Sequence, residues 1–201
     1  MRRVISLFLP LWPSDRLRRQ GKDAPPRDKP LVTARMEGQR RVLASVDRAA
    51  IRCGLDCGMT VTHAQSLVPD LTVLDAKPEE DEAALDRLGL WCVMYSPLVT
   101  PDPPDGLFID VAGSTHLFHG EIALMEDLRK RLKKAGISGR AAISDTPGCS
   151  WAVARYGENV HVPPGRASEA IASLPVASLR IAPRTVASRR RVYRTYHSPG
   201  C

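Results

Sequence analysis

The amino-acid sequence predicts an α+β fold, in which an antiparallel sheet carries helices on one face. Short apolar segments of strand length recur along the chain between prolines and glycines. Two longer segments, 78–93 and 121–135, have the apolar spacing that is typical of amphipathic helices. When residues 11–75 are set aside, the order becomes strand, helix, strand, strand, helix, strand, which is the split βαβ or ferredoxin-like arrangement.

The first strand is predicted at residues 4–9, because this apolar run ends at Pro10. Between it and residue 75 the pattern predicts only short elements. A helix is expected over 47–52, and Thr62 is expected to cap another that ends before Pro69. The remaining elements predicted there are a helix at 15–19 and strands at 31–33, 41–44 and 71–74.

The second half of the chain supplies the longer elements. Acidic residues begin the helix predicted at 78–93, and Leu85, Leu88 and Trp91 form its buried stripe. The helix predicted at 121–135 has a leucine-rich face opposite a charged one. The pattern also predicts a proline-rich extended turn at 97–104, strands at 107–111, 140–144 and 158–162, and a helix at 146–156.

The 201-residue chain has a formal net charge of +7, which is unevenly distributed. Residues 1–41 carry 11 Lys or Arg against 4 Asp or Glu, and residues 180–201 carry 6 Arg and no acid. Two basic ends indicate a polyanionic partner such as nucleic acid, although a solvated basic surface explains the same charges. The scattered cysteines are typical of a reducing cytosol, so we expect a cytoplasmic protein. No window approaches the roughly 18 apolar residues of a membrane span, and no membrane partner is expected.

Several local patterns resemble the palm and fingers of Y-family (UmuC-like) DNA polymerases. The stretch RCGLDCGMT at 52–60 resembles part of the fingers. The stretch YSPLV at 95–99, followed by DGLFIDV at 105–111, resembles the segment that leads into the family's second acidic motif. The stretch AAISDTPG at 141–148 resembles the palm strand and helix that follow, and the likeness is closest to the ImuB-type branch.

The resemblance spans residues 4–187 and implies a division into domains. The ferredoxin-like palm would comprise 1–10 and 75–163, a small fingers insertion 11–74, a partial helical thumb 164–187 and an atypical basic tail 188–201. The family continues with leucine-rich thumb helices, whereas the tail contains one aliphatic residue, Val192. We therefore expect a C-terminally truncated member of the family, in which binding of the sliding clamp is lost with the missing part.

Nucleotidyl transfer in this family uses two Mg²⁺ ions held by carboxylates. The resemblance places Leu7 and Gly106 where two of those carboxylates are expected, so that Asp105 alone remains. An Asp in a Pro-Pro-Asp-Gly stretch is also typical of an ordinary turn. The family's triphosphate contacts are replaced as well, at Arg48, Ile51 and Ala152. We expect no catalytic residue, no bound metal and no cofactor, and Mg²⁺ only if polymerase activity is retained.

The resemblance also implies that the thumb contacts the backbone of duplex DNA. Arginines without acidic neighbours suit phosphate contact, and the predicted DNA-binding residues are Arg180, Arg184, Arg189, Arg190 and Arg191. The basic run at 129–134 is interpreted as a solvated helix end. His116 and His119 are not interpreted as a metal site, because no third ligand is placed near them.

The resemblance therefore implies a non-catalytic accessory in DNA repair, acting in translesion synthesis and SOS-type mutagenesis. Its expected partners are primer-template DNA, an error-prone replicative-type polymerase and a RecA-like accessory protein. Two alternatives stay open. One is a catalytically active error-prone DNA polymerase whose metal ligands lie at other positions, and the other is a ferredoxin-like protein-interaction domain without a DNA role.

Overall fold

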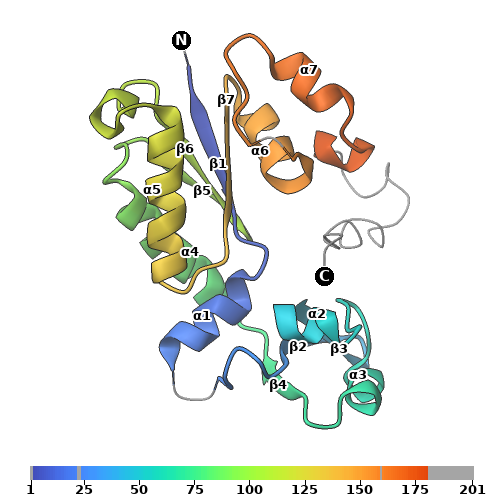
Figure 1. Ribbon diagram of the computed structural model, residues 1–201. Helices are drawn as coiled ribbons and strands as arrows, with labels where there is room; N and C mark the ends of the chain where they lie inside the picture. Colours follow the sequence, from blue (N-terminus) through green and yellow to red (C-terminus); the bar gives the residue numbers. More distant parts are fainter. Residues whose placement is uncertain (1, 22–23, 159, 181–201) are drawn as a thin grey trace.

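The structure, a computed structural model, describes residues 2–21, 24–158 and 160–180 and confirms the α+β class (Figure 1). Its larger sheet has the strand order β5-β6-β1-β7, and each neighbouring pair is antiparallel. With two helices these strands give the ferredoxin-like order that the sequence predicts. Their bounds are β1 Val4–Phe8, α4 Pro78–Cys92, β5 Val99–Asp102, β6 Gly106–Asp110, α5 Glu121–Lys134 and β7 Arg140–Ser144.

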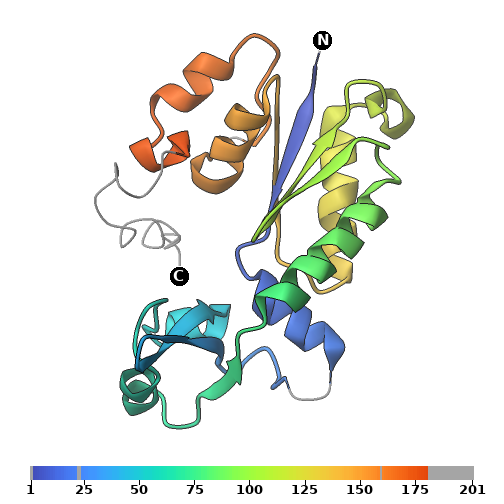
Figure 2. The ribbon, with the colours of Figure 1, turned by 180° about the vertical axis from the view of Figure 1, so that it is seen from behind.

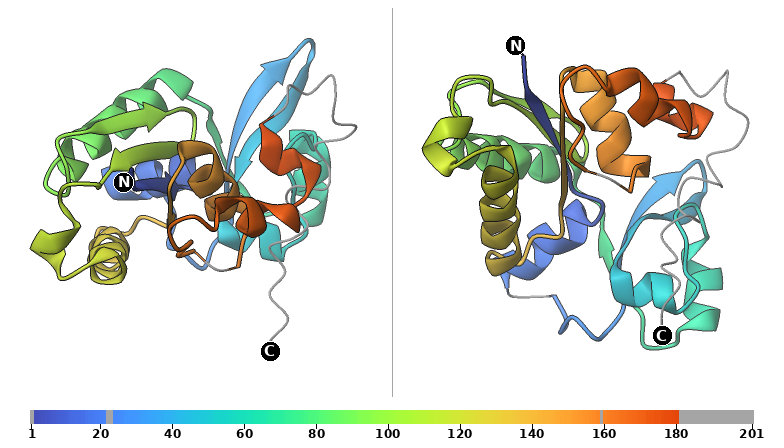
Figure 3. Two further views of the ribbon diagram at one scale, coloured as in Figure 1. Left: turned by 90° about the horizontal axis from the view of Figure 1, so that it is seen from above. Right: turned by 45° about the horizontal axis from the view of Figure 1, so that its top comes forward.

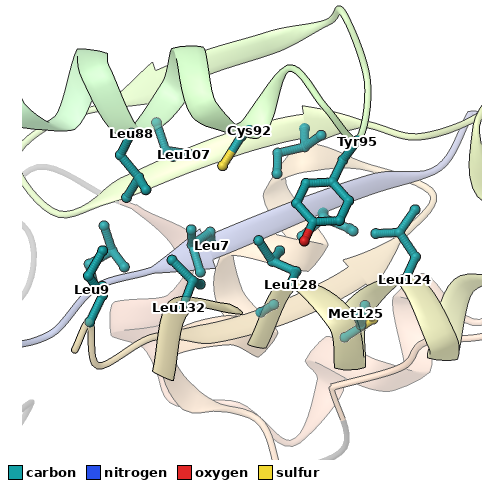
Figure 4. Packing of buried hydrophobic residues seen from close by; sticks show 14 of the residues in the cluster. Leu7, Leu9, Leu88, Cys92, Tyr95, Leu107, Leu124, Met125, Leu128 and Leu132 are labelled. Atoms are coloured by element: carbon teal, nitrogen blue, oxygen red, sulfur yellow. The ribbon is translucent and has the colours of Figure 1, made fainter. Parts of the chain in front are cut away.

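Helices α4 and α5 cover one face of this sheet and close the main core. Leu7 of β1 is fully buried there, between Leu88 of α4 and Leu128 of α5 (Figure 4). Successive side chains of a strand point to opposite faces. The neighbouring residue Phe8 accordingly belongs to a different apolar cluster, on the opposite face of the sheet.

Helix α6 covers part of that opposite face (Figure 3). The apolar side of α6, with Cys149 and Val153, is buried against Phe8 of β1 and Ala142 of β7. The prediction of helices on one face therefore describes α4 and α5, and α6 adds a layer on the other side because it has an apolar side of its own to bury. The elements at this end of the chain are α6 Pro147–Tyr156, α7 Ala167–Ala172 and the 3₁₀ helix η2 Val176–Leu179.

A small lobe with its own core lies below the four-stranded sheet in Figure 2. Its sheet has the order β3-β2-β4, in which β2 is antiparallel to β3 and parallel to β4. Val32, Leu43 and Ala50 are buried in this second core. The elements of the small lobe are β2 Leu31–Glu37, β3 Arg40–Val46, α2 Arg48–Arg52, α3 Val61–Leu67 and β4 Thr72–Asp75.

Helix α1 (Trp12–Gln20) packs with the larger sheet and α4. The ring of Trp12 is 1% exposed, and its indole N–H donates to the carbonyl oxygen of Asp81 at 2.8 Å. The helix starts earlier than the predicted residue 15, because Pro13 is well tolerated in a first turn, where backbone N–H groups have no helical acceptor. Helix α1 also contacts β2 and β3 of the small lobe, so it lies between the two cores.

The structure corrects three predictions of local structure. Thr60, not Thr62, caps α3, since its hydroxyl accepts from the N–H of His63 at 3.3 Å. The described part of 158–162 contributes an isolated bridge between Ile143 and His161 rather than a strand, since two prolines follow directly. The predicted extended turn at 97–104 contains strand β5, whose edge position tolerates proline. None of the described helices is long and apolar enough to cross a membrane.

Arg3, just before β1, is buried in a charged network at one end of the sheet. Its guanidinium donates to both carboxylate oxygens of Glu121, at 2.6 and 2.7 Å, and to Asp145 at 2.8 Å. The hydrogen bond from Arg3 holds the pKa of Glu121 below its usual range. The backbone N–H of Gly165, together with Arg3, holds the pKa of Asp145 below its usual range as well.

We expect Glu121→Gln to lower the free energy of unfolding at neutral pH by about 1.5–3 kcal/mol, the range for hydrogen bonds to charged groups. A carboxylate with a lowered folded-state pKa stabilises the fold above its unfolded pKa, and this contribution is lost as the pH falls through the folded value. The unmodified chain should therefore lose stability below about pH 4.3, and the variant should lose less. Urea unfolding at several pH values measures both. Glu126→Gln, at a half-exposed position on α5, is the control, and an equal pH slope in Glu121→Gln and the unmodified chain contradicts the prediction.

Candidate functional site

A cluster of charged and aromatic side chains lies on the face of the larger sheet opposite α4 and α5. The β5–β6 hairpin contributes two carboxylates, and α6 contributes a ring and a guanidinium that are four residues apart and so lie on one side of the helix. We call this group the Asp105 cluster, and it consists of Phe8, Asp102, Asp105, Trp151, Arg155 and Arg180.

Arg155 is the centre of the Asp105 cluster, and only 8% of its side chain is exposed. Its Nη2 donates to Oδ1 of Asp105 at 2.6 Å and lies 3.9 Å from Oδ2 of Asp102. The guanidinium carbon lies 4.4 Å from the centroid of the Phe8 ring and 4.3 Å from that of the Trp151 ring, within the range of cation–π attraction. The guanidinium of Arg155 therefore pairs with Asp105 and lies close to Asp102, between two aromatic rings.

Burial raises the pKa of Asp105 above its ordinary value, and the charge of Arg155 limits that rise. Desolvation penalises the charged form of a carboxylate, so a buried carboxylate needs a cation to stay ionised at low cost. In this cluster the cation is a side chain of the protein itself. The ionised state of Asp105 thus depends on Arg155.

The residues of the Asp105 cluster do not fit a pair of Mg²⁺ ions. Mg²⁺ requires oxygen ligands in near-octahedral geometry, whereas the group between Asp102 and Asp105 is the guanidinium of Arg155. The positions around it offer the ring of Phe8 and the bare backbone of Gly106 instead of further oxygens. In the described ranges, no group of three His, Cys, Asp or Glu side chains is placed to hold a metal ion.

The register of β1 bears directly on the predicted site position Leu7. Leu7 points into the main core, whereas Phe8 pairs with Gly106 across β1 and β6 and contacts Arg155. Because side chains alternate along a strand, a shift of one residue moves the position to the opposite face of the sheet. The β1 residue that faces the cluster is therefore Phe8, one residue beyond the predicted position.

The predicted palm position on α6 is displaced in the same way. Ala152 is 3% exposed and buried in the protein, whereas its neighbour Trp151 contacts both Arg155 and Arg180. The two predicted fingers positions, Arg48 and Ile51, lie exposed on α2 of the small lobe and have no contact with the cluster among the interactions of the described residues. The structure thus brings Asp105 and Gly106 together, but none of the other predicted metal or triphosphate positions joins them.

Arg180 is the one predicted DNA-binding residue that the structure describes. Its Nη2 donates to Oδ1 of Asp102 at 2.8 Å, and its guanidinium carbon lies 4.8 Å from the Trp151 ring centroid. About half of the side chain, 47%, remains exposed to solvent. The other predicted residues, Arg184, Arg189, Arg190 and Arg191, lie outside the described residues.

Sequence reasoning missed four members of this site: Phe8, Asp102, Trp151 and Arg155. Asp102 lies in a segment that was interpreted as a turn, and its pairing with Gly106 across the β5–β6 hairpin was not foreseen. Trp151 and Arg155 share one side of α6, and this spacing of an aromatic and a cationic residue was a usable signal.

Gly106 leaves no free room for a carboxylate side chain. A Cβ at this position would lie 3.0 Å from the carbonyl oxygen of Leu7 and 3.2 Å from Nη2 of Arg155. We expect Gly106→Glu to lower the free energy of unfolding by about 1–3 kcal/mol, the usual cost of overpacking, and to create no Mg²⁺ affinity. Urea unfolding with and without Mg²⁺ measures both, and Gly113→Glu, with open space around it, is the control. Stabilisation by Mg²⁺ in Gly106→Glu alone contradicts the prediction.

Comparison with known proteins bears on the identity of this fold and site. The sequence profile of the impB/mucB/samB family matches residues 19–155, which is more than half of the chain. The chain belongs to this family. The assignment agrees with the predicted Y-family (UmuC-like) resemblance and with the observed arrangement of the larger sheet and the small lobe.

Curated relatives carry the same assignment. Protein ImuB of Caulobacter vibrioides is 49% identical over 129 residues, which are 64% of this chain and 28% of that protein. DNA polymerase IV of Pseudomonas savastanoi is 28% identical over 104 residues, which are 52% of this chain and 30% of that protein. The chain thus matches less than a third of the length of each of these relatives.

Solved structures of polymerases share the fold. An insertion ternary complex of Dbh DNA polymerase superimposes with a TM-score of 0.70 at 16% identity, covering 88% of this chain and 53% of that one. DinB from Sulfolobus solfataricus superimposes with a TM-score of 0.63 at 17% identity, covering 84% of this chain and 50% of that one. The likeness establishes a polymerase-like arrangement of the described elements.

Proposed function

We propose that this protein is a non-catalytic, polymerase-like accessory of DNA repair that takes part in translesion synthesis. The observation that carries the proposal is the ion pair of Arg155 with Asp105, 2.6 Å long, which places a guanidinium beside the carboxylate that the resemblance assigns to Mg²⁺. Phosphoryl transfer in polymerases depends on two metal ions that stabilise the attacking and leaving oxygens. A site whose carboxylates are balanced by an arginine has no such ions to offer.

DNA binding is the second part of the proposal. Support comes from the net charge of +7 and from exposed arginines on the small lobe, including Arg48 and Arg52. Arg180, half exposed beside Trp151, is proposed to contact the phosphate backbone. Contacts of this kind position a protein on primer-template DNA without reading its sequence.

The partners are proposed from the likeness to protein ImuB, which is 49% identical over 129 residues. We propose that the protein acts in the cytoplasm in SOS-type mutagenesis, together with an error-prone replicative-type polymerase and a RecA-like accessory protein. In this scheme the palm-like sheet holds DNA while the partner polymerase supplies the chemistry.

Primer extension with Mg²⁺ or Mn²⁺ tests the absence of catalysis. We expect no extension by this chain under conditions in which a DNA polymerase IV extends the same primer. Extension that disappears in an Asp105→Ala variant would overturn the proposal and favour an active error-prone polymerase.

Salt-dependent binding to a primer-template duplex tests the DNA role separately. The logarithm of the binding constant should fall linearly with the logarithm of the salt concentration, with a slope of about −0.9 for each phosphate contacted. Arg48→Glu combined with Arg52→Glu should weaken binding, while Arg129→Glu on the helical face should not. Binding no tighter than that of a neutral control protein favours a protein-interaction domain without a DNA role.

A further inference from the structure

A groove with a strong excess of positive charge lies where α1, α4 and α5 meet. Helices α4 and α5 cover the face of the sheet opposite the Asp105 cluster, so the groove is separate from that site. Its volume is ≈ 820 Å³, which lies within the range of small-ligand sites. The charged side chains that line it are Arg16, Arg19, Arg87, Arg131 and Lys134, against the one carboxylate of Asp127.

Most of this charge is not balanced within the protein. Arg131 is paired, because its Nε donates to Oδ2 of Asp127 at 2.7 Å. Arg19, Arg87 and Lys134 are exposed and make no ion pair in the described parts of the chain. Three cationic side chains of the groove are therefore available to bind an anionic ligand.

Arg16 adds a buried donor at the wall of the groove. Only 4% of its side chain is exposed, and its Nε and Nη1 donate to Asp81 at 2.5 Å and Glu80 at 2.8 Å. Its Nη2 is buried and has no hydrogen-bond partner among the described residues. Buried donors without an acceptor are rare in native proteins. A phosphate oxygen is an acceptor that suits the geometry of a guanidinium.

Trp91 gives the groove an aromatic wall. Its side chain is 37% exposed, and its ring forms a T-shaped pair with Tyr95, at 5.9 Å between centroids and 73° between planes. Ala84 and Leu88 on the same helix provide apolar surface beside it. A fixed, half-exposed indole is a stacking surface for a nucleobase.

We infer that this groove binds a nucleotide, with the phosphates on Arg16, Arg19, Arg87 and Lys134 and the base against Trp91. The combination of a phosphate-binding wall and a stacking ring selects this ligand class over an acidic peptide, which would use the cations and leave the ring unused. The nucleotide is either a free nucleoside triphosphate or part of a single strand, since both present the same groups. The inference does not rest on the proposed accessory role.

Titration of the full chain with dTTP, inorganic tripolyphosphate and an oligothymidylate of about eight nucleotides tests the inference. We expect dTTP to bind more tightly than tripolyphosphate, because the phosphate chain alone lacks the base. Tighter binding of the oligothymidylate than of dTTP assigns the groove to a strand, and the reverse order assigns it to the free nucleotide. Binding of tripolyphosphate as tight as that of dTTP, or displacement of dTTP by a polyglutamate peptide at equal charge, overturns the inference.

Variants locate the binding in the groove. Arg19→Glu combined with Arg87→Glu reverses two exposed charges and should weaken dTTP binding at least about tenfold, as the loss of a charge-assisted hydrogen bond does. Arg129→Glu, an exposed position of α5 outside the groove, should change it less than about twofold. Trp91→Leu should weaken dTTP binding and leave tripolyphosphate binding unchanged. Circular dichroism confirms that each variant is folded, and Lys134→Glu replaces a charge-reversal variant that is not. If the groove variants bind dTTP as tightly as Arg129→Glu does, the assignment of the ligand to the groove is overturned.

Discussion

A chain with Leu7→Asp is expected not to fold. Leu7 is fully buried between Leu88 and Leu128 in the main core, so the substitution removes a buried aliphatic side chain and places a carboxylate among apolar side chains. The first effect alone costs about 2–5 kcal/mol. The buried charge adds several kcal/mol, which together approach or exceed the total stability of about 5–15 kcal/mol for a native domain. Circular dichroism and urea unfolding measure the result.

The matched variant is Phe8→Asp, one residue along the same strand. It loses a buried aromatic ring, at a cost of about 3–5 kcal/mol, but its carboxylate lies beside Arg155, whose guanidinium carbon is 4.4 Å from the present ring centroid. We expect this chain to fold with reduced stability. Leu7→Met, which conserves volume, should cost less than about 1.5 kcal/mol. A folded Leu7→Asp chain, or equal destabilisation by Leu7→Asp and Phe8→Asp, contradicts the register of β1.

The sequence could predict the long helices and most strands of the fold, but not the apolar layer under α6. Apolar periodicity identified the two long helices and most strands, because burial against one face imposes that periodicity directly. The sheet order followed from the order of elements, since a ferredoxin-like arrangement is one of few that bury both helices. The second apolar layer under α6 was missed, because the small residues Ala142, Cys149 and Ala154 that form it give a weak pattern.

The candidate site was harder to predict than the fold. The sequence motifs located Asp105 and Gly106 in a tight hairpin, where prolines and glycine restrict the alignment. In β1 and α6 the local sequence has no such marker, and the predicted positions Leu7 and Ala152 lie one residue from the side chains that face the cluster, Phe8 and Trp151. A strand changes face with each residue and a helix turns by about 100°, so one residue decides what a side chain touches.

Arg155→Ala is expected to lower the free energy of unfolding by about 3–5 kcal/mol, the cost of breaking a buried ion pair by removing one partner. The variant leaves Asp105 without the cation 2.6 Å away and removes the contacts of the guanidinium with Phe8 and Trp151. Asp102 keeps its ion pair with Arg180 at 2.8 Å, so Asp105 bears most of the loss. Urea unfolding measures the effect. Arg166→Ala is the control, because its side chain is 62% exposed and paired only at the surface, and should cost no more than about 0.5 kcal/mol.

The pH dependence of this penalty separates a lost charge pair from a lost packing contact. Burial already raises the pKa of Asp105, and Arg155 opposes the rise, so removing Arg155 should raise that pKa further. An acid with a raised folded-state pKa destabilises the fold in its ionised form, and this effect disappears as the pH falls below its unfolded value. The cost of Arg155→Ala should therefore shrink toward about pH 4. Combining it with Asp105→Asn should remove the pH-dependent part at neutral pH, because no unpaired charge is left to bury. The loss of unfolding free energy in Arg155→Ala is compared at neutral pH and near pH 4. If this loss is the same at both pH values and unchanged in the double variant, Arg155 stabilises the fold by packing alone.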